Sequence, residues 1–174
     1  MGKVVSLIQA RHMCQRLHQR GKTVVFTNGV FDLLHVGHVR YLRAARRLGH
    51  ALFVGLNSDC CTRNLKGPDR PLLPQAERAE VLCALACVDY VVIFDELTAE
   101  HLVVALQPDV YAKGGDYAAG DGAKGPGGNA LPEAPAVESY GGRVVLLPYT
   151  PGRSTTELIA RILNGNKIEE TERA

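Results

Sequence analysis

The sequence predicts an α/β fold of three layers, with a parallel sheet of five strands between two layers of helices. Segments with the composition of strands alternate along the chain with segments that have helical spacing. Apolar runs at residues 91–93 and 144–147 are typical of strands that are covered on both faces. Strands and helices that alternate in this way form parallel sheets through right-handed crossovers.

The first element is an amphipathic helix in the N-terminal segment, residues 1–21. Apolar residues such as Leu7, Ala10 and Cys14 recur at helical spacing over residues 7–20, and Gly21 follows the end of the helix. The later elements are predicted, in chain order, as strand 23–28, helix 39–48, strand 51–57, helix 76–86, strand 90–94, helix 99–106, strand 109–113, strand 143–147 and helix 156–163. All of them are expected to form one domain over residues 1–174.

Two segments depart from this alternation. Residues 117–132 are rich in glycine and contain almost no large apolar side chain, so they cannot bury a face. We interpret them as a loop or lid, and an idle insertion is the alternative that composition leaves open. The tail, residues 167–174, is polar and is expected to fray.

Composition limits the classes of function. The net charge is +2 and both signs of charge are spread along the sequence, without the basic block that nucleic-acid binders carry. Residues 1–6 do not resemble an export signal, and no apolar run is long enough to cross a membrane. Five cysteines without a CxxC pair indicate neither a disulfide framework nor a zinc finger. We therefore expect a cytoplasmic protein that binds small anionic ligands.

The most specific candidate site is the segment from His35 to His38. It follows a predicted strand and precedes a helix, whose first backbone N–H groups are unpaired and suit a phosphate. Gly37 allows close approach of the backbone, and both imidazoles can donate hydrogen bonds to charge that develops on phosphorus. Two histidines without a joint role are the alternative, but the coincidence of glycine, strand end and helix start favours a phosphate site.

Other candidates also follow predicted strands, where open parallel sheets bind their ligands. Ser154, Thr155 and Thr156 begin the last helix. With Arg153 beside them they suit the outer phosphates of a triphosphate, although helix capping alone would explain the hydroxyl groups. Lys66 is expected on a Gly/Pro loop, where an exposed surface lysine is the alternative.

Two further candidates are less specific on their own. Arg78 lies on a predicted helix, where it serves either a phosphate or a neighbouring glutamate. Lys113, Gly114, Gly115 and Asp116 follow the fourth predicted strand. The lysine supplies charge for a phosphate, the glycines give room, and the aspartate can accept hydrogen bonds from sugar hydroxyls. A tight turn with an exposed lysine is the alternative.

The segment from Gly29 to His38 resembles the HxGH nucleotidyltransferases, a Rossmann-like family that includes cytidylyltransferases of glycerol phosphate and choline phosphate. The likeness covers most of the chain and is greatest to the branch whose members make ADP-heptose from heptose 1-phosphate. The matching phrases are, in order, residues 26–32, 57–59, 65–67, 88–92, 113–117 and 152–156.

This resemblance implies an enzyme that transfers AMP from ATP to a sugar 1-phosphate. Because such a reaction holds two anions in line, we also expect a divalent metal, Mg²⁺, carried mainly by the triphosphate, with no dedicated protein metal site. Catalytic roles are implied for His35, His38 and Lys66. The nucleotide would be bound by Asn28, Gly29, Phe31, Asp32, His35, His38, Arg78, Arg153, Ser154, Thr155 and Thr156, and the acceptor by Lys113, Gly114, Gly115 and Asp116. The implied partners are a second copy in a homodimer and a separate sugar kinase that makes the acceptor.

Two other functions remain open on the sequence. A cytidylyltransferase that acts on glycerol 3-phosphate or another alcohol phosphate would use the same chemistry with CTP. A nucleotide-binding module without turnover belongs to a different class. The nucleotide and acceptor that are used distinguish an adenylyltransferase from a cytidylyltransferase. Release of pyrophosphate distinguishes both enzymes from a nucleotide-binding module.

Overall fold

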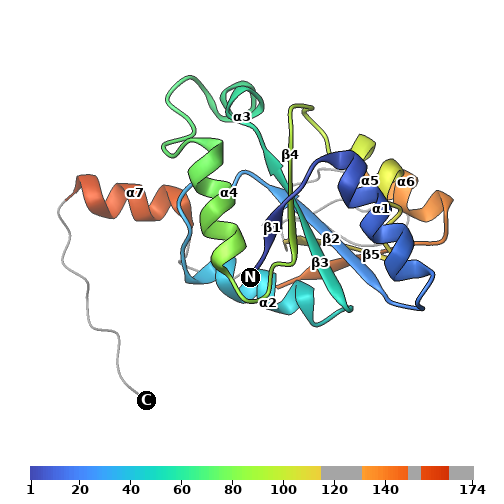
Figure 1. Cartoon of the computed structure of the whole chain (residues 1–174). Helices are drawn as coiled ribbons and strands as arrows, with labels where there is room; N and C mark the ends of the chain where they lie inside the picture. The colour runs from blue at the N-terminus through green and yellow to red at the C-terminus, as the bar shows by residue number, and fades with distance from the viewer. Residues whose placement is uncertain (115–130, 149–153, 165–174) are drawn as a thin grey trace, which may run out of the picture.

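The computed structural model describes residues 1–114, 131–148 and 154–164, in which strands and helices alternate as predicted (Figure 1). The strands are β1 (Lys3–Val4), β2 (Val24–Gly29), β3 (Ala51–Asn57), β4 (Tyr90–Phe94), β5 (Val110–Gly114) and β6 (Arg143–Leu147). The helices are α1 (Leu7–His18), α2 (Val36–Arg46), α3 (Asp59–Lys66), α4 (Gln75–Ala84), α5 (Glu100–Leu106), α6 (Ala134–Ser139) and α7 (Thr155–Leu163). None of these described helices has the length and apolar character needed to cross a membrane.

The strands form one parallel sheet in the order β1-β4-β3-β2-β5-β6. The predicted α/β class is confirmed, but the predicted count of five strands was wrong, because the described residues already form a sheet of six. The additional strand is β1, in which Lys3 and Val4 pair with β4. Two exposed residues leave no periodic pattern in the sequence, so the segment 1–21 was expected to hold a helix alone.

The strand order reverses beside β2. The chain proceeds from β2 to β3 and β4 on one side, and then crosses to β5 and β6 on the other side. Phe26 of β2 is therefore in register with both Phe53 of β3 and Tyr111 of β5. Open parallel sheets bind ligands at such a switch point, outside the carboxyl ends of the strands.

Helices cover both faces of the sheet (Figure 1). Helices α1, α5 and α6 pack on one face, where the core includes Phe26, Phe53 and Leu102. Helices α2 and α4 pack on the other face, where the core includes Leu42 and Leu82. Helix α7 projects from this body and has no buried residue. Burial on both faces explains the apolar run at 91–93, whereas residues 144–147 belong to the edge strand β6, where only Leu147 is buried.

Two helices were not predicted, and one of them changes the position of a candidate residue. Helix α3 begins after Ser58, whose hydroxyl accepts a hydrogen bond from the N–H of Cys61 at 3.2 Å. Lys66 was expected on a Gly/Pro loop, but it is the last residue of α3, directly before Gly67 with a φ of 99°. Helix α6 has only six residues, too few for a periodic pattern.

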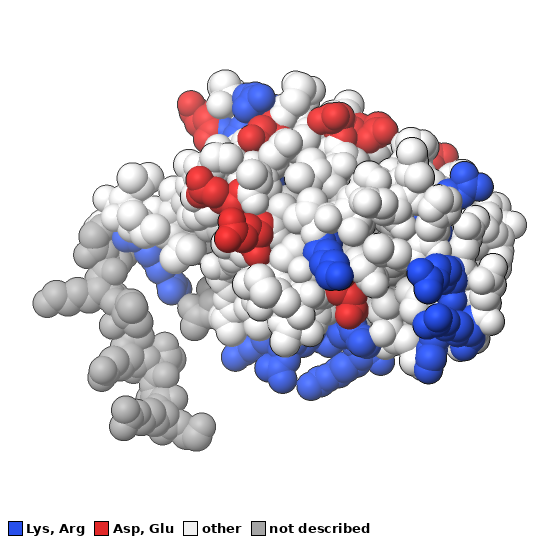
Figure 2. All heavy atoms as spheres, in the orientation of Figure 1, with Lys and Arg blue, Asp and Glu red and all other residues white. Residues whose placement is uncertain are grey.

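Charged side chains are segregated on the face of the molecule that Figure 2 shows. Lys and Arg gather along its lower edge, at α2, whereas Asp and Glu lie mostly in its upper half. Arg40 and Arg43 of helix α2 are exposed, and so is Arg47, directly after the helix. The cluster of basic side chains at α2 is not evident from the even spread of charge along the sequence. It forms because residues three and four positions apart lie on the same side of a helix.

Candidate active site

A cleft of about 710 Å³ opens at the carboxyl ends of the strands. Its lining comes from β2, β3 and β5, from the loop after β4, and from the beginnings of α2 and α7. The predicted site residues in this lining are Asn28, Gly29, Phe31, Asp32, His35, His38, Lys66, Lys113, Gly114, Ser154, Thr155 and Thr156. The switch point therefore brings together most of the residues that the sequence indicated.

Some predicted residues cannot be placed in this cleft. Gly115, Asp116 and Arg153 lie outside the described residues. The same holds for residues 117–130 of the predicted lid and for the tail 167–174. Of the lid, Leu131 and Pro132 are described, and Pro132 lines the cleft.

The two histidines stand at the beginning of α2. His35 is the N-cap residue of this helix, and its Nδ1 accepts a hydrogen bond from the N–H of Gly37 at 3.1 Å. The rings of His35 and His38 are stacked, with their centroids 3.9 Å apart. This stack fixes both imidazoles beside the first backbone N–H groups of the helix, which have no intrahelical partners.

Phe31 supports the histidine pair with a strained backbone. Its φ is 46°, in the left-handed region that favours glycine, and its side chain is buried. The ring meets His38 edge-on, with centroids 5.3 Å apart. Gly29 leaves room for it, because a Cβ atom there would lie 3.1 Å from the Phe31 ring. Strained residues of this kind concentrate at functional sites, and here the strain places an aromatic ring against His38.

His38 is neutral in the folded protein. Its pKa falls from 6.5 to about 4, first because the ring is buried and then because of the neighbouring His35, while the backbone of Leu33 opposes the shift. A bound triphosphate would raise the pKa of His38 again, since a nearby negative charge favours the protonated ring. The imidazole would therefore gain positive charge when a phosphate is present.

The neutral state of His38 predicts a dependence of stability on pH. The unfolded chain binds a proton at this ring below pH 6.5, whereas the folded protein does so only near pH 4, so stability is lost as the pH falls through this window. At pH 5 the loss due to His38 is about 2 kcal/mol. Urea unfolding at pH 8 and pH 5 gives the free energy of unfolding at each pH. Between the two, His38→Gln should lose about 2 kcal/mol less of this free energy than the wild type. His12→Gln, on the exposed side of α1, is the matched control, and an equal gain in both variants would contradict the assignment.

Helix α7 begins in the same cleft. Ser154 and Glu157 form a capping box, in which the N–H of Glu157 donates to Ser154 Oγ at 3.1 Å and the N–H of Ser154 donates to Glu157 Oε2 at 2.8 Å. Thr155 Oγ1 donates to the carbonyl of Leu33 at 3.4 Å, and Thr156 lines the cleft. The Ser154 hydroxyl is thus engaged in capping, and the backbone N–H groups of the first turn are what α7 offers to an anion.

Arg78 does not line the cleft, so the predicted contact with a phosphate needs correction. Its side chain is fully buried. The guanidinium donates to the carbonyl of Leu73 at 2.9 Å, to the carbonyl of Val30, and to Asp59 Oδ1 at 2.7 Å. These bonds join the turn after β2 to α3 and to the segment before α4. Arg78 is therefore a positioning residue.

Asp32 also has protein partners, although it lines the cleft. Its Oδ1 accepts hydrogen bonds from the N–H groups of Leu72 and Leu73 at 2.8 and 3.1 Å. Its Oδ2 pairs with Arg70 Nη1 at 2.9 Å. Arg70 is a cation of the cleft that sequence reasoning missed. Its place in the same Gly/Pro segment as Lys66 is the signal that would have indicated it.

Lys113 lies at the switch point, at the end of β5. Its Nζ donates a hydrogen bond to Asn28 Oδ1 at 2.7 Å, and the hydroxyl of Tyr111 donates to the same oxygen at 2.7 Å. Burial lowers the pKa of Lys113, and the carboxylate of Glu133 opposes this shift. An exposed surface lysine is therefore not the correct description of this residue.

Several further cleft residues were missed. The Tyr41 hydroxyl lies 2.6 Å from Thr27 Oγ1 and donates to the carbonyl of Ala112 at 3.0 Å, which joins α2 to β2 and β5. The helical spacing of Tyr41 suggested only a core contact. Four other polar residues line the part of the cleft near β3 and β4, namely Asn57, Thr62, Thr98 and Glu133. Two of these belong to α3 or precede α6, the helices that were not predicted.

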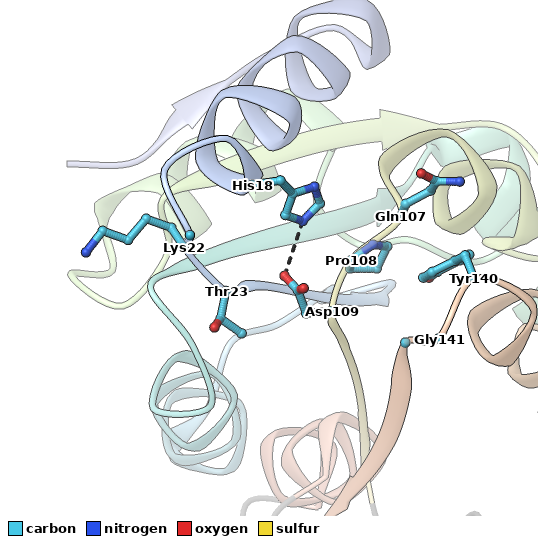
Figure 3. A pocket seen from close by; sticks show the side chains of 10 residues that line it. His18, Lys22, Thr23, Gln107, Pro108, Asp109, Tyr140 and Gly141 are labelled. Atoms are coloured by element: carbon cyan, nitrogen blue, oxygen red, sulfur yellow. Dashed lines mark hydrogen bonds and ion pairs between the residues drawn. The ribbon is translucent and has the colours of Figure 1, made fainter.

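A second hollow, of about 440 Å³, lies at the opposite edge of the sheet (Figure 3). There His18 Nε2 of α1 pairs with Asp109 Oδ2 at 3.2 Å, and the same oxygen accepts a hydrogen bond from the N–H of Val24 at 2.6 Å. This contact ties α1 to the sheet. The lining of the hollow contains none of the predicted site residues.

Among residues 1–114, 131–148 and 154–164, no group of three or more His, Cys, Asp or Glu side chains is arranged to hold a metal ion. The two carboxylates in the cleft lining, Asp32 and Glu133, both accept hydrogen bonds from backbone N–H groups.

Residues 26–161 match the family model described as cytidylyltransferase-like. The chain belongs to the cytidylyltransferase-like family. The matched range includes the histidine pair, Lys66, Lys113 and the beginning of α7. Membership confirms the resemblance to the HxGH nucleotidyltransferases, and with it the predicted class of enzyme, a nucleotidyltransferase.

Curated relatives and solved structures are similar to this chain, among them two bifunctional proteins and one lipopolysaccharide core biosynthesis protein. Bifunctional protein HldE of Syntrophotalea carbinolica is 56% identical over 146 residues, which are 84% of this chain and 28% of that protein. Bifunctional protein HldE of Citrifermentans bemidjiense is 50% identical over 162 residues, 93% of this chain and 31% of that protein. The chain thus spans less than a third of the length of these relatives. The lipopolysaccharide core biosynthesis protein from Thermoplasma volcanium GSS1 has a TM-score of 0.58 and 26% identity, covering 75% of this chain and 98% of that chain.

Proposed function

We propose that this protein transfers AMP from ATP to a sugar 1-phosphate, specifically heptose 1-phosphate, and releases ADP-heptose and pyrophosphate. The observation that carries the proposal is the convergence, on one cleft, of two helix N-termini, the stacked histidine pair, Lys66 and Lys113. Such a cleft suits two phosphorylated ligands that meet end to end. The names of the relatives, HldE and a lipopolysaccharide core biosynthesis protein, agree with the synthesis of a nucleotide-sugar precursor.

The proposed reaction makes one bond and breaks one bond at the α-phosphorus of ATP. An oxygen of the sugar phosphate attacks this phosphorus, and the bond to the bridging oxygen of the β-phosphate breaks, so that pyrophosphate leaves with the electron pair. A phosphate monoester has a second pKa of about 6 and is already an anion near neutral pH, so no general base is required. The protein has to align two anions and neutralise charge.

Different groups of the cleft bind different phosphates in this proposal. His35 and His38, with the first N–H groups of α2, stabilise the charge that develops on the α-phosphate. The first turn of α7 binds the outer phosphates, and Lys66 at the end of α3 neutralises phosphate oxygens. Lys113 serves the phosphate of the acceptor. The roles of Arg153, Gly115 and Asp116 remain those that the resemblance implies.

Mg²⁺ would enter the site with the triphosphate. Both carboxylate oxygens of Asp32 already have protein partners, so oxygens of the triphosphate are the main ligands for the ion. When bound there, the ion supplies positive charge to the phosphates that leave.

A cytoplasmic location is part of the proposal. All five cysteines are free, as is usual in a reducing compartment, and ATP is abundant there. The homodimer and the separate sugar kinase that would make the acceptor stay predictions, as does the single domain over residues 1–174.

Release of pyrophosphate tests the proposal. The chain is incubated with ATP or CTP and with heptose 1-phosphate, glucose 1-phosphate, glycerol 3-phosphate or choline phosphate. Release should be fastest with ATP and heptose 1-phosphate, and should be absent with ATP alone. Faster release with CTP and glycerol 3-phosphate would identify a cytidylyltransferase. Nucleotide binding without release for any acceptor would identify a non-catalytic binding module.

A further inference from the structure

One part of the cleft has no role in the reaction scheme, and it contains two buried polar atoms that lack a hydrogen-bond partner in the part of the chain that the structure describes. Thr62 Oγ1 and Glu133 Oε2 have no hydrogen-bond partner among the described residues, and the two side chains belong to residues that are 0% and 3% exposed. Each such atom costs about 1–3 kcal/mol when it stays unpaired. Two of them in the lining of one cleft indicate that a ligand completes their hydrogen bonds.

The loop between β4 and α5 connects these two residues. Glu133 Oε1 accepts a hydrogen bond from the N–H of Ala99 at 2.9 Å, which anchors one oxygen of the carboxylate and leaves the other for a ligand. On the other side, Cys61, the neighbour of Thr62, donates from Sγ to the carbonyl of Glu96 at 3.0 Å. Both residues are therefore fixed relative to the same loop, whose residues Leu97 and Thr98 also line the cleft.

The strand order assigns this part of the cleft to the acceptor. The phosphate site at α7 follows β6, on one side of β2, whereas Thr62 and the loop follow β3 and β4, on the other side. In-line displacement at phosphorus places the attacking group opposite the leaving group. With pyrophosphate at α7, the sugar of the acceptor extends toward β3 and β4, where Lys66 lies at the end of α3, and its phosphate lies over β2, where Lys113 Nζ donates to Asn28.

We propose that Glu133 and Thr62 bind hydroxyl groups of the acceptor and select a polyhydroxylated phosphate ester. Glu133 accepts hydrogen bonds from the ligand through Oε2, and Thr62 Oγ1 exchanges a hydrogen bond with a neighbouring hydroxyl. A site built around such groups discriminates strongly against an acceptor without hydroxyls, because its buried polar atoms then stay unpaired. This inference rests on the proposed function and names the substrate class of the same cleft.

Glu133→Gln tests the inference, because the amide oxygen can still accept from Ala99 while the amide N–H₂ replaces the accepting Oε2. The kcat/KM for heptose 1-phosphate should fall about 10-fold or more, whereas the KM for ATP should change less than about threefold. Thr62→Val keeps the volume and should give a smaller loss in the same direction. Glu138→Gln, on the exposed side of helix α6, which Glu133 precedes as N-cap residue, is the matched control and should behave as the wild type. The midpoint of thermal unfolding should be the same for Glu133→Gln and the control.

A graded set of acceptors separates this inference from the proposed function. Heptose 1-phosphate, glycerol 3-phosphate and choline phosphate are compared by turnover, and by calorimetric binding in the presence of α,β-methylene ATP. The inference holds if turnover and affinity of the wild type increase with the number of hydroxyls on the acceptor and Glu133→Gln removes this trend. This outcome supports the inference even if heptose 1-phosphate is not the natural substrate. It is overturned if Glu133→Gln leaves the ranking unchanged or weakens ATP and all acceptors equally. A wild-type preference for choline phosphate would overturn both.

Discussion

Replacement of His38 with alanine should lower the rate of turnover by about 10²-fold or more, while the affinity for ATP changes less. The substitution removes a donor to the charge that develops on the α-phosphate, and it also removes the ring on which His35 stacks at 3.9 Å. Steady-state release of pyrophosphate gives the turnover, and calorimetric titration with ATP gives the affinity.

A control and a second variant distinguish a role of His38 in the transition state from a structural role. His12→Ala, on the exposed side of α1, should retain the turnover of the wild type. His38→Gln keeps a hydrogen-bonding side chain of similar size and should recover less than the full rate. Near-normal turnover of His38→Ala would contradict a role of this ring in the transition state. A parallel loss of ATP affinity and unfolding free energy would assign it a structural role instead.

Replacement of Arg78 with methionine should lower the free energy of unfolding by about 3 kcal/mol. Methionine keeps much of the apolar volume, but it leaves Asp59 without its ion-pair partner and the carbonyls of Val30 and Leu73 without their donor. Urea unfolding at neutral pH measures the change. Arg47→Met, at an exposed position after α2, should cost less than about 0.5 kcal/mol.

The same pair of variants decides between the two descriptions of Arg78. If Arg78 is a positioning residue, Arg78→Met should lower the free energy of unfolding, and ATP should bind more weakly because the turn after β2 is less well fixed. If Arg78→Met is as stable as the wild type but binds ATP much more weakly, the arginine contacts phosphate directly, as the sequence resemblance implied.

The central part of the fold could be predicted because the sheet is buried on both faces. The strands at 51–57, 90–94 and 143–147 have the predicted bounds, since their apolar runs end where the chain leaves the core. The same logic located the cleft, because parallel strands present their carboxyl ends at one edge. His35 and Ser154 follow different strands, Lys113 lies at the end of a third, and all three line one cleft.

The missed features depend on contacts between distant parts of the chain. The family resemblance implied that Asp32 and Arg78 contact a nucleotide, but they have protein partners, Leu72 and Asp59 among them, which no local pattern identifies. Strand β1 and helix α6 are too short to show a period. Glu133 was missed because it lies just beyond the glycine-rich segment 117–132, where no helix was expected.

The fate of labelled oxygen tests the proposed reaction most directly. Heptose 1-phosphate with ¹⁸O in its phosphate is incubated with ATP, Mg²⁺ and the full chain, and the products are followed by phosphorus NMR and mass spectrometry. Attack of the acceptor on the α-phosphorus predicts ADP-heptose that retains the label, including the oxygen between its two phosphorus atoms, and pyrophosphate without label. ADP together with a doubly phosphorylated heptose, or labelled inorganic phosphate, would contradict the proposed transfer of AMP.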